Sequence, residues 1–314
     1  MVRVIVFGMG HLGRWHVDKA CALEDSQLVA VVDPSPAALE KLQERNLDIP
    51  LFKSPEEAFA AVEFDAGIIV TPTSLHYDLC KKLLSLNKHI FCEKPMTSTS
   101  KEALEIEELV KEKGVVFQVG HSERYHSIWS EVKTKTNYFQ NAPSFQLQRR
   151  APFKGRATDV DVVQDLMIHD LDLLLFLYKE KPSRLKAIGH KVRTDKWDFV
   201  RAFIEYANGA HATITVGRNY VHEVREFEVI NEQGSLHVDL FKRELKEASK
   251  EETQEFVRTT SYEGRDHLLE EQKLFYRAIL KKGEPVVNET EGREAVTLVS
   301  KVLESLDKGQ WIEC

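Results

Sequence analysis

Three groups of polar residues have types and spacings that suit acid–base chemistry or anion binding. The first is Glu93-Lys94-Pro95, which follows a short apolar run. A lysine that loses solvent drops in pKa and could then share a proton with a substrate hydroxyl. Proline restricts the lysine before it, and a cis peptide bond at this position would fix the direction of its side chain. Taken alone, this sequence more often indicates a lysine on the protein surface that is followed by a proline in a turn.

The second group is Asp165, His169 and Asp172, which would share one face of a helix because they stand four and seven positions apart. The residues between them are mostly apolar, so a polar stripe there needs a wet pocket or buried partners. A carboxylate one turn away can orient a histidine and raise its basicity. An ordinary solvated helix face is nearly as good an interpretation. Metal binding by the trio is less favoured, because no further ligand cluster is evident.

The third group is basic and surrounds Pro152-Phe153. Its members are Arg149, Arg150, Lys154 and Arg156, with Arg124 upstream. Such local positive charge suits a phosphorylated or otherwise anionic substrate. For any one of these residues, a solvated basic loop is the more common explanation.

The element best suited to position such groups is at the start of the chain. An apolar strand, residues 2–7, runs directly into Gly8-x-Gly10-x-x-Gly13, and a helical pattern follows. Gly8 allows a tight turn, Gly10 lets the backbone approach phosphates, and Gly13 lets the helix lie close to the strand. The amides at the helix N-terminus then face an anion. This arrangement predicts a site for the pyrophosphate of a dinucleotide.

A second apolar strand, residues 28–32, ends in Asp33. The acid stands about 20 residues past the motif, where a carboxylate that bonds the adenosine ribose is expected. It favours NAD over NADP, because a carboxylate repels a 2′-phosphate and no arginine follows at 34–37. The alternative is a glycine turn in another kind of α/β protein. This alternative is less favoured, because strand, glycines, helix, second strand and acid follow in the expected order.

Up to Gly120 strands and helices alternate, which predicts a doubly wound parallel sheet with helices on both faces. Ligands of such sheets bind beyond the carboxyl ends of the strands. Those ends carry five polar clusters, which would face one crevice: 8–13, 33, 71–76, 93–95 and 120–121.

Beyond this point the pattern changes to an α+β domain. An apolar helix over 165–178 is followed by strand-like stretches, which predict an antiparallel sheet: 184–192, 199–206, 210–216, 226–231 and 235–240. Residues 246–255 are highly charged and are expected to form a solvated loop or edge. Two helices, 266–281 and 290–306, close the chain. We therefore expect a nucleotide-binding domain at 1–121 and a second domain at 122–314.

Bulk composition agrees with this division. The 314 residues suggest two domains, and 42% of them are apolar. A net charge of −7 gives no support for binding to nucleic acid or an anionic membrane. Four scattered cysteines argue against a disulfide scaffold or zinc and favour a reducing compartment, hence the cytoplasm. No signal peptide is visible, because the first strand begins at residue 2, and no apolar run has the length of a membrane span.

The order of these motifs resembles the glucose–fructose oxidoreductase / inositol dehydrogenase (Gfo/Idh/MocA) family over essentially the whole chain. The matching motifs are the glycine motif with His16, Thr71-Pro72 followed by His76, Glu93-Lys94-Pro95, and Asp165-x-x-x-His169. The resemblance implies a Rossmann domain and a domain with an open antiparallel sheet that commonly mediates homodimers or homotetramers. It further implies an NAD-dependent sugar dehydrogenase.

The resemblance also implies roles for single residues. Lys94 and His169 would flank the reacting carbinol, with Asp165 supporting them. Which of Lys94 and His169 takes the hydroxyl proton stays open. Glu93 would contact the nicotinamide ribose. Together, motif and resemblance place the cofactor against Gly8, Met9, Gly10, His11, Leu12, Gly13, Asp33, Thr71, Pro72, His76, Glu93 and Lys94.

A narrower likeness concerns the substrate. Residues 119–125 and 150–170 resemble the branch that oxidises the 3-hydroxyl of UDP-N-acetylglucosamine, which would assign the diphosphate to the basic loop. The substrate would then contact Arg124, Tyr125, Arg150, Arg156 and Asp172. This branch usually has Phe-Asn-Pro where this chain has Tyr125-His126-Ser127, and glycine where Asp161 stands. A free sugar or cyclitol is the alternative substrate, and a dinucleotide-sensing regulator without turnover is the alternative function.

Overall fold

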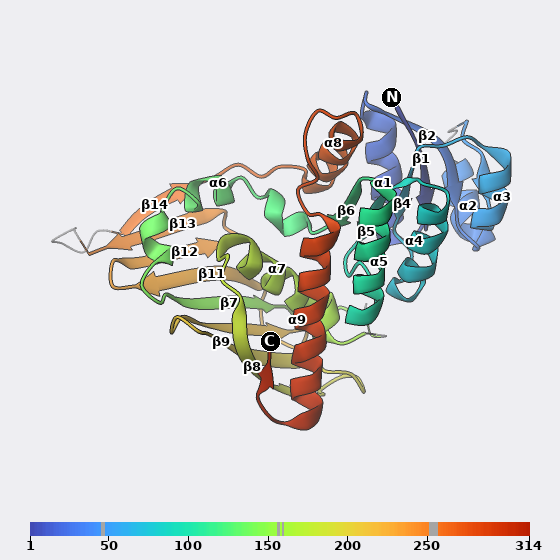
Figure 1. Cartoon of the computed structure of the whole chain (residues 1–314). Helices are drawn as coiled ribbons and strands as arrows, with labels where there is room; N and C mark the ends of the chain where they lie inside the picture. The colour runs from blue at the N-terminus through green and yellow to red at the C-terminus, as the bar shows by residue number, and fades with distance from the viewer. Residues whose placement is uncertain (45–47, 156–157, 159, 251–256) are drawn as a thin grey trace. The chain divides into compact units, whose positions relative to one another are not determined.

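The computed structural model describes residues 1–44, 48–155, 158, 160–250 and 257–314, which form two compact units (Figure 1). Unit 1 comprises Met1–Ser122 and Asp266–Val296, and unit 2 comprises Glu123–Arg265 and Thr297–Cys314. The chain first passes from unit 1 to unit 2 after Ser122, one residue beyond the boundary expected from the sequence. The segment Asp266–Val296 returns to unit 1, which the sequence did not indicate. Helix α9 (Glu289–Lys308) contributes to both units.

Unit 1 is built on a six-stranded sheet in the order β3-β2-β1-β4-β5-β6, and every neighbouring pair is parallel. The strands are β1 (Val2–Phe7), β2 (Ser26–Val32), β3 (Leu51–Phe52), β4 (Ala66–Ile69), β5 (His89–Glu93) and β6 (Phe117–Gly120). The order reverses between β1 and β4, which is the point where dinucleotides bind in this fold. The expected doubly wound sheet is confirmed. The two-residue strand β3 was not predicted.

Helices cover both faces of this sheet (Figure 1). One face packs against α1 (His11–Ala22), α2 (Pro36–Gln43) and α8 (His267–Ile279), through a core that contains Val4, Val17, Leu42 and Phe275. The other face meets α3 (Pro55–Ala61) and α4 (His76–Ser85), with α5 (Ser100–Lys113) beside α4. Helices α3 and α5 begin with side-chain caps, in which Ser54 and Thr99 accept hydrogen bonds from the backbone N–H groups of Glu57 and Glu102.

Unit 2 contains a nine-stranded sheet in the order β14-β13-β12-β11-β7-β10-β9-β8-β15. Its strands are β7 (Ser144–Arg150), β8 (Pro182–His190), β9 (Phe199–Tyr206), β10 (His211–Gly217), β11 (Val224–Asn231), β12 (Gly234–Asp239), β13 (Glu244–Ser249), β14 (Val257–Ser261) and β15 (Ile312–Glu313). Among the described strands of this sheet, only β7 and β10 pair in parallel. The expectation of a loop or edge at 246–255 was wrong for β13, which pairs on both sides. Residues 251–256 lie outside the described residues.

The helix expected at 165–178 consists of two parts. One turn of π-helix covers Val163–Met167, and α7 covers Ile168–Leu177. The carboxylate of Asp161 accepts hydrogen bonds from the backbone N–H groups of Val163 and Gln164, which caps this segment. A π-turn contains more residues than an α-turn. The direction of Asp165 relative to His169 therefore differs from that in a regular α-helix.

Two buried ion pairs hold α7 in unit 2. Asp172 accepts hydrogen bonds from Nε and Nη2 of Arg124, at 2.9 and 2.7 Å. Asp170 accepts one from Nη2 of Arg149, on β7, at 3.0 Å. Neither carboxylate is more than 2% exposed. Removing one member of such a pair would leave an uncompensated charge in the core, so both pairs fix the helix that carries His169.

The opposite face of the unit 2 sheet is more exposed than the face covered by α7. Tyr178, at the end of α7, contacts Phe145 and Tyr206 on the covered face. Side chains that alternate with the buried ones point the other way, and Ile188, Phe203 and Ile230 are 37–49% exposed. None of the helices in the described ranges combines the length and apolar character needed to cross a bilayer.

The glycine motif yields the first prediction. A Cβ at Gly13 would lie 2.0 Å from the carbonyl oxygen of Gly8, whereas nothing lies within 4 Å of a Cβ at Gly10. We expect Gly13→Ala to lower the free energy of unfolding by about 1–3 kcal/mol, because α1 must move away from the turn. Urea unfolding followed by circular dichroism measures this change.

Gly10→Ala is the matched control. We expect it to cost less than about 1 kcal/mol of stability, because Gly10 is a helix N-cap with φ of −66° and open space around it. It should nevertheless weaken NAD binding, since a methyl group would occupy the path of the phosphates. Equal stability of Gly13→Ala and the wild type would contradict this account of the turn.

Candidate active site

The turn after β1 has the geometry that a pyrophosphate site requires. Gly8 has a φ of +101°, and Gly10 is the N-cap of α1. The close approach of Gly13 to Gly8 brings the N-terminal turn of α1, His11 to Gly13, directly against the end of β1. The open space at Gly10 and the amides of this turn fit an anionic phosphate pair.

Asp33 stands beside this turn and is fixed by backbone donors. Its Oδ2 accepts a hydrogen bond from the N–H of Met9 at 2.6 Å, and its Oδ1 accepts one from the N–H of Ser35 at 2.8 Å. A pocket of about 270 Å³ adjoins the turn and is lined by Met9, Gly10, Arg14, Ser35, Ala37 and Ala38. A fixed carboxylate with remaining lone pairs suits the ribose hydroxyls of an adenosine. Arg14 was not singled out from the sequence.

His76 connects two other parts of the expected cofactor site. Its Nδ1 lies 2.8 Å from the carbonyl oxygen of Pro95, and its Nε2 lies 2.9 Å from that of Thr71. Burial lowers the pKa of His76, and the two carbonyl acceptors act against that shift. The ring therefore ties the loop after β4 to the turn that contains Lys94. The peptide bond between Lys94 and Pro95 is cis.

Glu93 ends β5 and is almost completely buried. Its Oε1 lies 2.8 Å from Nε2 of His16, and its Oε2 accepts a hydrogen bond from the backbone N–H of Lys94 at 3.2 Å. Burial alone would raise the pKa of Glu93, but the bond from His16 and the charge of Lys94 hold it below its ordinary value. A Cβ at Gly120 would lie 2.9 Å from the carboxyl carbon, so only glycine leaves room for this carboxylate.

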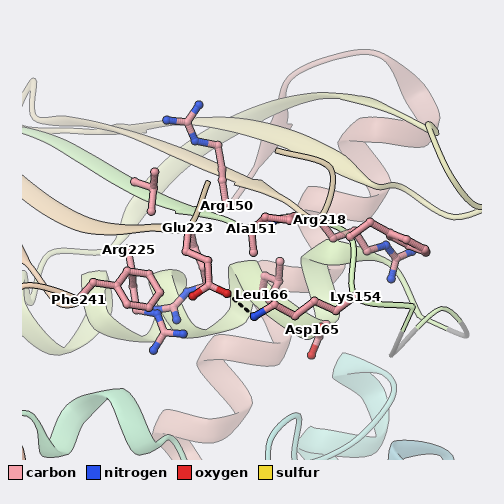
Figure 2. A pocket seen from close by; sticks show the side chains of 13 residues that line it. Arg150, Ala151, Lys154, Asp165, Leu166, Arg218, Glu223, Arg225 and Phe241 are labelled. Atoms are coloured by element: carbon pink, nitrogen blue, oxygen red, sulfur yellow. Dashed lines mark hydrogen bonds and ion pairs between the residues drawn. The ribbon is translucent and has the colours of Figure 1, made fainter. Parts of the chain in front are cut away.

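Unit 2 contains a basic pocket of about 120 Å³ (Figure 2). Its lining residues are Arg149, Arg150, Ala151, Pro152, Phe153, Lys154, Asp165, Leu166, Arg218, Glu223, Val224, Arg225 and Phe241. The pocket brings Asp165 together with most of the basic group expected from the sequence. Lys154 forms an ion pair with Glu223. Arg156 lies outside the described residues.

The side chain of Arg150 points in a different direction from the other basic side chains that line the pocket. Figure 2 shows its guanidinium pointing away from Lys154 and Glu223. It lies over the ring of Tyr220, 4.0 Å from the centroid, and donates to Gln148. Successive residues of a strand point to opposite faces, so Arg149 and Arg150 separate. Within the pocket, Lys154 and Arg225 are the better placed cations.

A network of buried charges lies behind this pocket. Glu123 accepts from Nη1 of Arg149 at 2.9 Å and from Nη1 of Arg225 at 3.0 Å, and it lies 3.1 Å from Nε2 of His126. Burial would raise the pKa of Glu123, but Arg149, His126 and Arg225 hold it well below its usual range. Burial raises the pKa of Asp170 despite its contact with Arg149. The carboxylates of Glu123 and Asp170 thus fix Arg149 and Arg225. Neither carboxylate was singled out from the sequence.

Arg218 anchors the loop that precedes Asp165. It donates to Asp198 at 2.7 Å and to the carbonyl oxygen of Val160 at 3.0 Å. Burial would raise the pKa of Asp198, but three backbone amides (residues 192–194) and Arg218 lower it strongly. Val160 is therefore held to residues at the ends of β9 and β10, just before the π-turn.

The remaining expected residues divide between the units. Arg124 and Asp172 bind one another in the core of unit 2, and Tyr125, next to them in the sequence, is 8% exposed. His169 is half-buried near the start of α7, beside the buried Asp170. The described residues contain no cluster of three or more histidine, cysteine or acidic side chains suited to a metal ion. His11 and Leu12 are exposed in the first turn of α1.

Known proteins match both parts of the chain. Residues 2–121 match the model of an oxidoreductase family with an NAD-binding Rossmann fold, and residues 132–237 match the GFO/IDH/MocA C-terminal domain. A UDP-N-acetylglucosamine 3-dehydrogenase of Acidithiobacillus ferrooxidans is 33% identical over 245 residues, which cover 78% of this chain and 76% of that protein. An NAD-dependent scyllo-inositol 2-dehydrogenase of Bacillus subtilis is 29% identical, over 76% of this chain and 73% of its own length.

Solved structures agree. The Acidithiobacillus ferrooxidans enzyme superposes with a TM-score of 0.88 at 30% identity, over 98% of each chain. A scyllo-inositol dehydrogenase of Lactobacillus casei has a TM-score of 0.85 at 18% identity, over 100% of this chain and 99% of that one, which shows the fold alone. The family expected from the sequence is therefore confirmed: the chain belongs to the Gfo/Idh/MocA oxidoreductases and is an NAD-dependent dehydrogenase that acts on CH–OH groups.

Proposed function

We propose that this dehydrogenase oxidises a nucleotide sugar, and that its substrate is UDP-N-acetylglucosamine, oxidised at the 3-hydroxyl, or a close relative. The observation that carries the proposal is the pocket of unit 2, in which Asp165 lies among basic side chains. A free sugar or inositol has no charge for such a pocket to bind. The relative that is 33% identical is named for the same reaction.

The chemistry of the pocket suits a nucleoside diphosphate. Lys154 and Arg225 can each donate hydrogen bonds to phosphate oxygens. Phe153 and Phe241 are 37% and 45% exposed, and they offer apolar ring faces beside these cations. An exposed aromatic ring can stack with any nucleobase. Arg150, Arg156 and Tyr125 remain proposed substrate contacts, whereas the paired Arg124 and Asp172 better suit a role in fixing α7.

In the proposed mechanism, NAD supplies the hydride acceptor when it is bound. Either Lys94 or His169 takes the proton of the reacting hydroxyl, and Asp165 supports them. The turn after β5 carries Lys94, and the buried acids of α7 fix His169. Glu93 would contact the nicotinamide ribose of bound NAD, and Asp33 would contact its adenosine ribose. Removal of the hydroxyl proton, with the hydride passing to the acceptor that bound NAD would supply, would convert the carbinol to a ketone.

Activity with a substrate panel tests this proposal first. We expect NADH absorbance to rise with NAD and UDP-N-acetylglucosamine but not with inositol or simple sugars. Lys94→Ala should lower kcat by about 10²–10⁴-fold, because a proton-transfer group is lost, and should still bind NAD. Signal with inositol or free sugars alone would contradict the nucleotide-sugar assignment and leave the family unaffected.

Removing a pocket cation tests the diphosphate contact. Lys154→Ala should raise KM for the nucleotide sugar roughly tenfold or more, with little change in KM for NAD, because a hydrogen bond to a charged group is lost. Lys308→Ala is the matched control: both lysines pair with a glutamate, and their side chains are 55% and 54% exposed. The same KM in both variants would contradict a role for Lys154 in substrate binding.

We also propose that the exposed sheet face forms the interface of a homodimer or homotetramer. Its half-exposed apolar side chains, including Phe203, suit burial against a second copy. Sedimentation velocity should show an oligomer that Phe203→Glu shifts toward monomer. Val221→Glu, which changes an 83% exposed residue after β10, should leave it unchanged. A wild type that sediments only as monomer at working concentration would reject this interface.

A further inference from the structure

A chain of buried polar side chains starts at the end of β5, and only its first member, Glu93, has a role in the proposed mechanism. It consists of Glu93, His16, Gln272 and Tyr276, and the last three are 0% exposed. Gln272 and Tyr276 belong to α8, in the segment that returns to unit 1 after residue 265. These four side chains therefore connect the expected cofactor site to α8, whose Gln272 lies 256 residues from His16 in the sequence.

The orientation of the Gln272 amide follows from its neighbours. Its Nε2 lies 3.0 Å from the backbone carbonyl oxygen of His16, and this oxygen can only accept a hydrogen bond. The opposite orientation would place two acceptors against each other. The hydroxyl of Tyr276 donates to Oε1 of Gln272 at 2.8 Å, which supports the same orientation.

The protonation of the His16 ring follows from that orientation. The same Nε2 of Gln272 lies 2.9 Å from Nδ1 of His16, so Nδ1 must accept and carries no proton. The proton of the neutral ring is then on Nε2, and it is donated to Oε1 of Glu93 at 2.8 Å. A protonated ring would turn an N–H group toward the amide N–H₂.

The charge of Glu93 depends on this arrangement. A neutral His16 orients the carboxylate and leaves its full negative charge in place, whereas an imidazolium would cancel it. The oxidised nicotinamide ring carries a positive charge that the reduced ring lacks. A negative carboxylate near it therefore favours the binding of NAD⁺ over NADH.

We propose that Gln272 is a positioning residue of the cofactor site: its amide keeps His16 neutral, with the proton on Nε2, so that Glu93 presents a full negative charge to the nicotinamide ribose. The inference rests on the proposed contact between Glu93 and that ribose. It does not depend on which sugar is the substrate.

Other groups near this chain must be considered in its test. The ring of Phe91 lies against His16, with centroids 5.3 Å apart. The charge of Lys94 and the ring of His76 also interact with Glu93. These groups are the same in every variant below, so differences between variants report on Gln272.

The first measurement is the protonation of His16 in the intact protein. Magic-angle-spinning spectra of protein labelled with ¹⁵N in its histidine rings separate protonated from unprotonated ring nitrogens, and a His16→Asn spectrum assigns the signals. We expect a bare Nδ1 and a protonated Nε2 from pH 6 to pH 8.5. An imidazolium, or a proton on Nδ1 of the neutral ring, would overturn the proposal without any assay of turnover.

The second measurement compares cofactor affinities. Gln272→Leu keeps the side-chain volume and removes the donor, so His16 should gain a proton as the pH falls. The ratio of Kd for NAD⁺ to Kd for NADH should then rise about tenfold between pH 8.5 and pH 6, and the wild-type ratio should change less than about twofold. Gln272→Met serves the same purpose if the leucine variant does not fold.

Tyr276→Phe is the matched control. It removes the hydrogen bond to Oε1 of Gln272 from the same buried chain and leaves both contacts of the amide nitrogen to His16. We expect wild-type ¹⁵N signals and a wild-type Kd ratio. If Gln272→Leu and Tyr276→Phe behave alike, Gln272 acts only through packing and the proposal is wrong. A loss of activity toward nucleotide sugars alone would count against the proposed function, not against this inference.

Discussion

The cost of removing ionised carboxylates from water is the constraint on which both units depend. An isolated buried charge is too expensive to keep, so each one must find donors that the fold holds in place. In unit 1 one such carboxylate is Glu93, and its donors are His16 and a backbone amide. In unit 2 the buried carboxylates include those of Glu123, Asp170 and Asp172, and arginines from other segments meet them. The residues expected to do chemistry, Lys94 and His169, each stand next to such a carboxylate.

This constraint gives a reason for the path of the chain. His16 meets Glu93 only if its other ring nitrogen has a partner, and that partner comes from α8. The return of Asp266–Val296 to unit 1 thus supplies a buried polar group as well as apolar packing through Phe275. Likewise, Arg124 follows β6 in sequence and reaches Asp172 on α7, so the start of unit 2 and its central helix are fixed together.

Sequence reasoning succeeded where the information is local. The strand–glycine–helix pattern at 2–13 and the second strand, which ends before Asp33, are each encoded within a few residues, and the structure has them as expected. It failed where distant residues decide the outcome. The charged segment of β13 becomes an inner strand because β12 and β14 pair with it, and the amide of Gln272 has no local signal except a glutamine on the buried side of an amphipathic helix. The direction of Arg150 follows from strand alternation, so the pattern of β7 contained that information.

In the proposed function the two units would recognise their ligands by different means. Unit 1 would present backbone amides and one carboxylate to a dinucleotide, and the glycine spacing that positions those amides can be read directly from the sequence. Unit 2 presents side chains from β7, β11 and the loops around them, and their directions depend on which acids neutralise them. Arg149 and Arg225 share Glu123, so a change at one buried carboxylate would redirect two cations at once. Under the proposed function, the pairing of these buried charges sets the directions of the cations that would bind a charged nucleotide sugar.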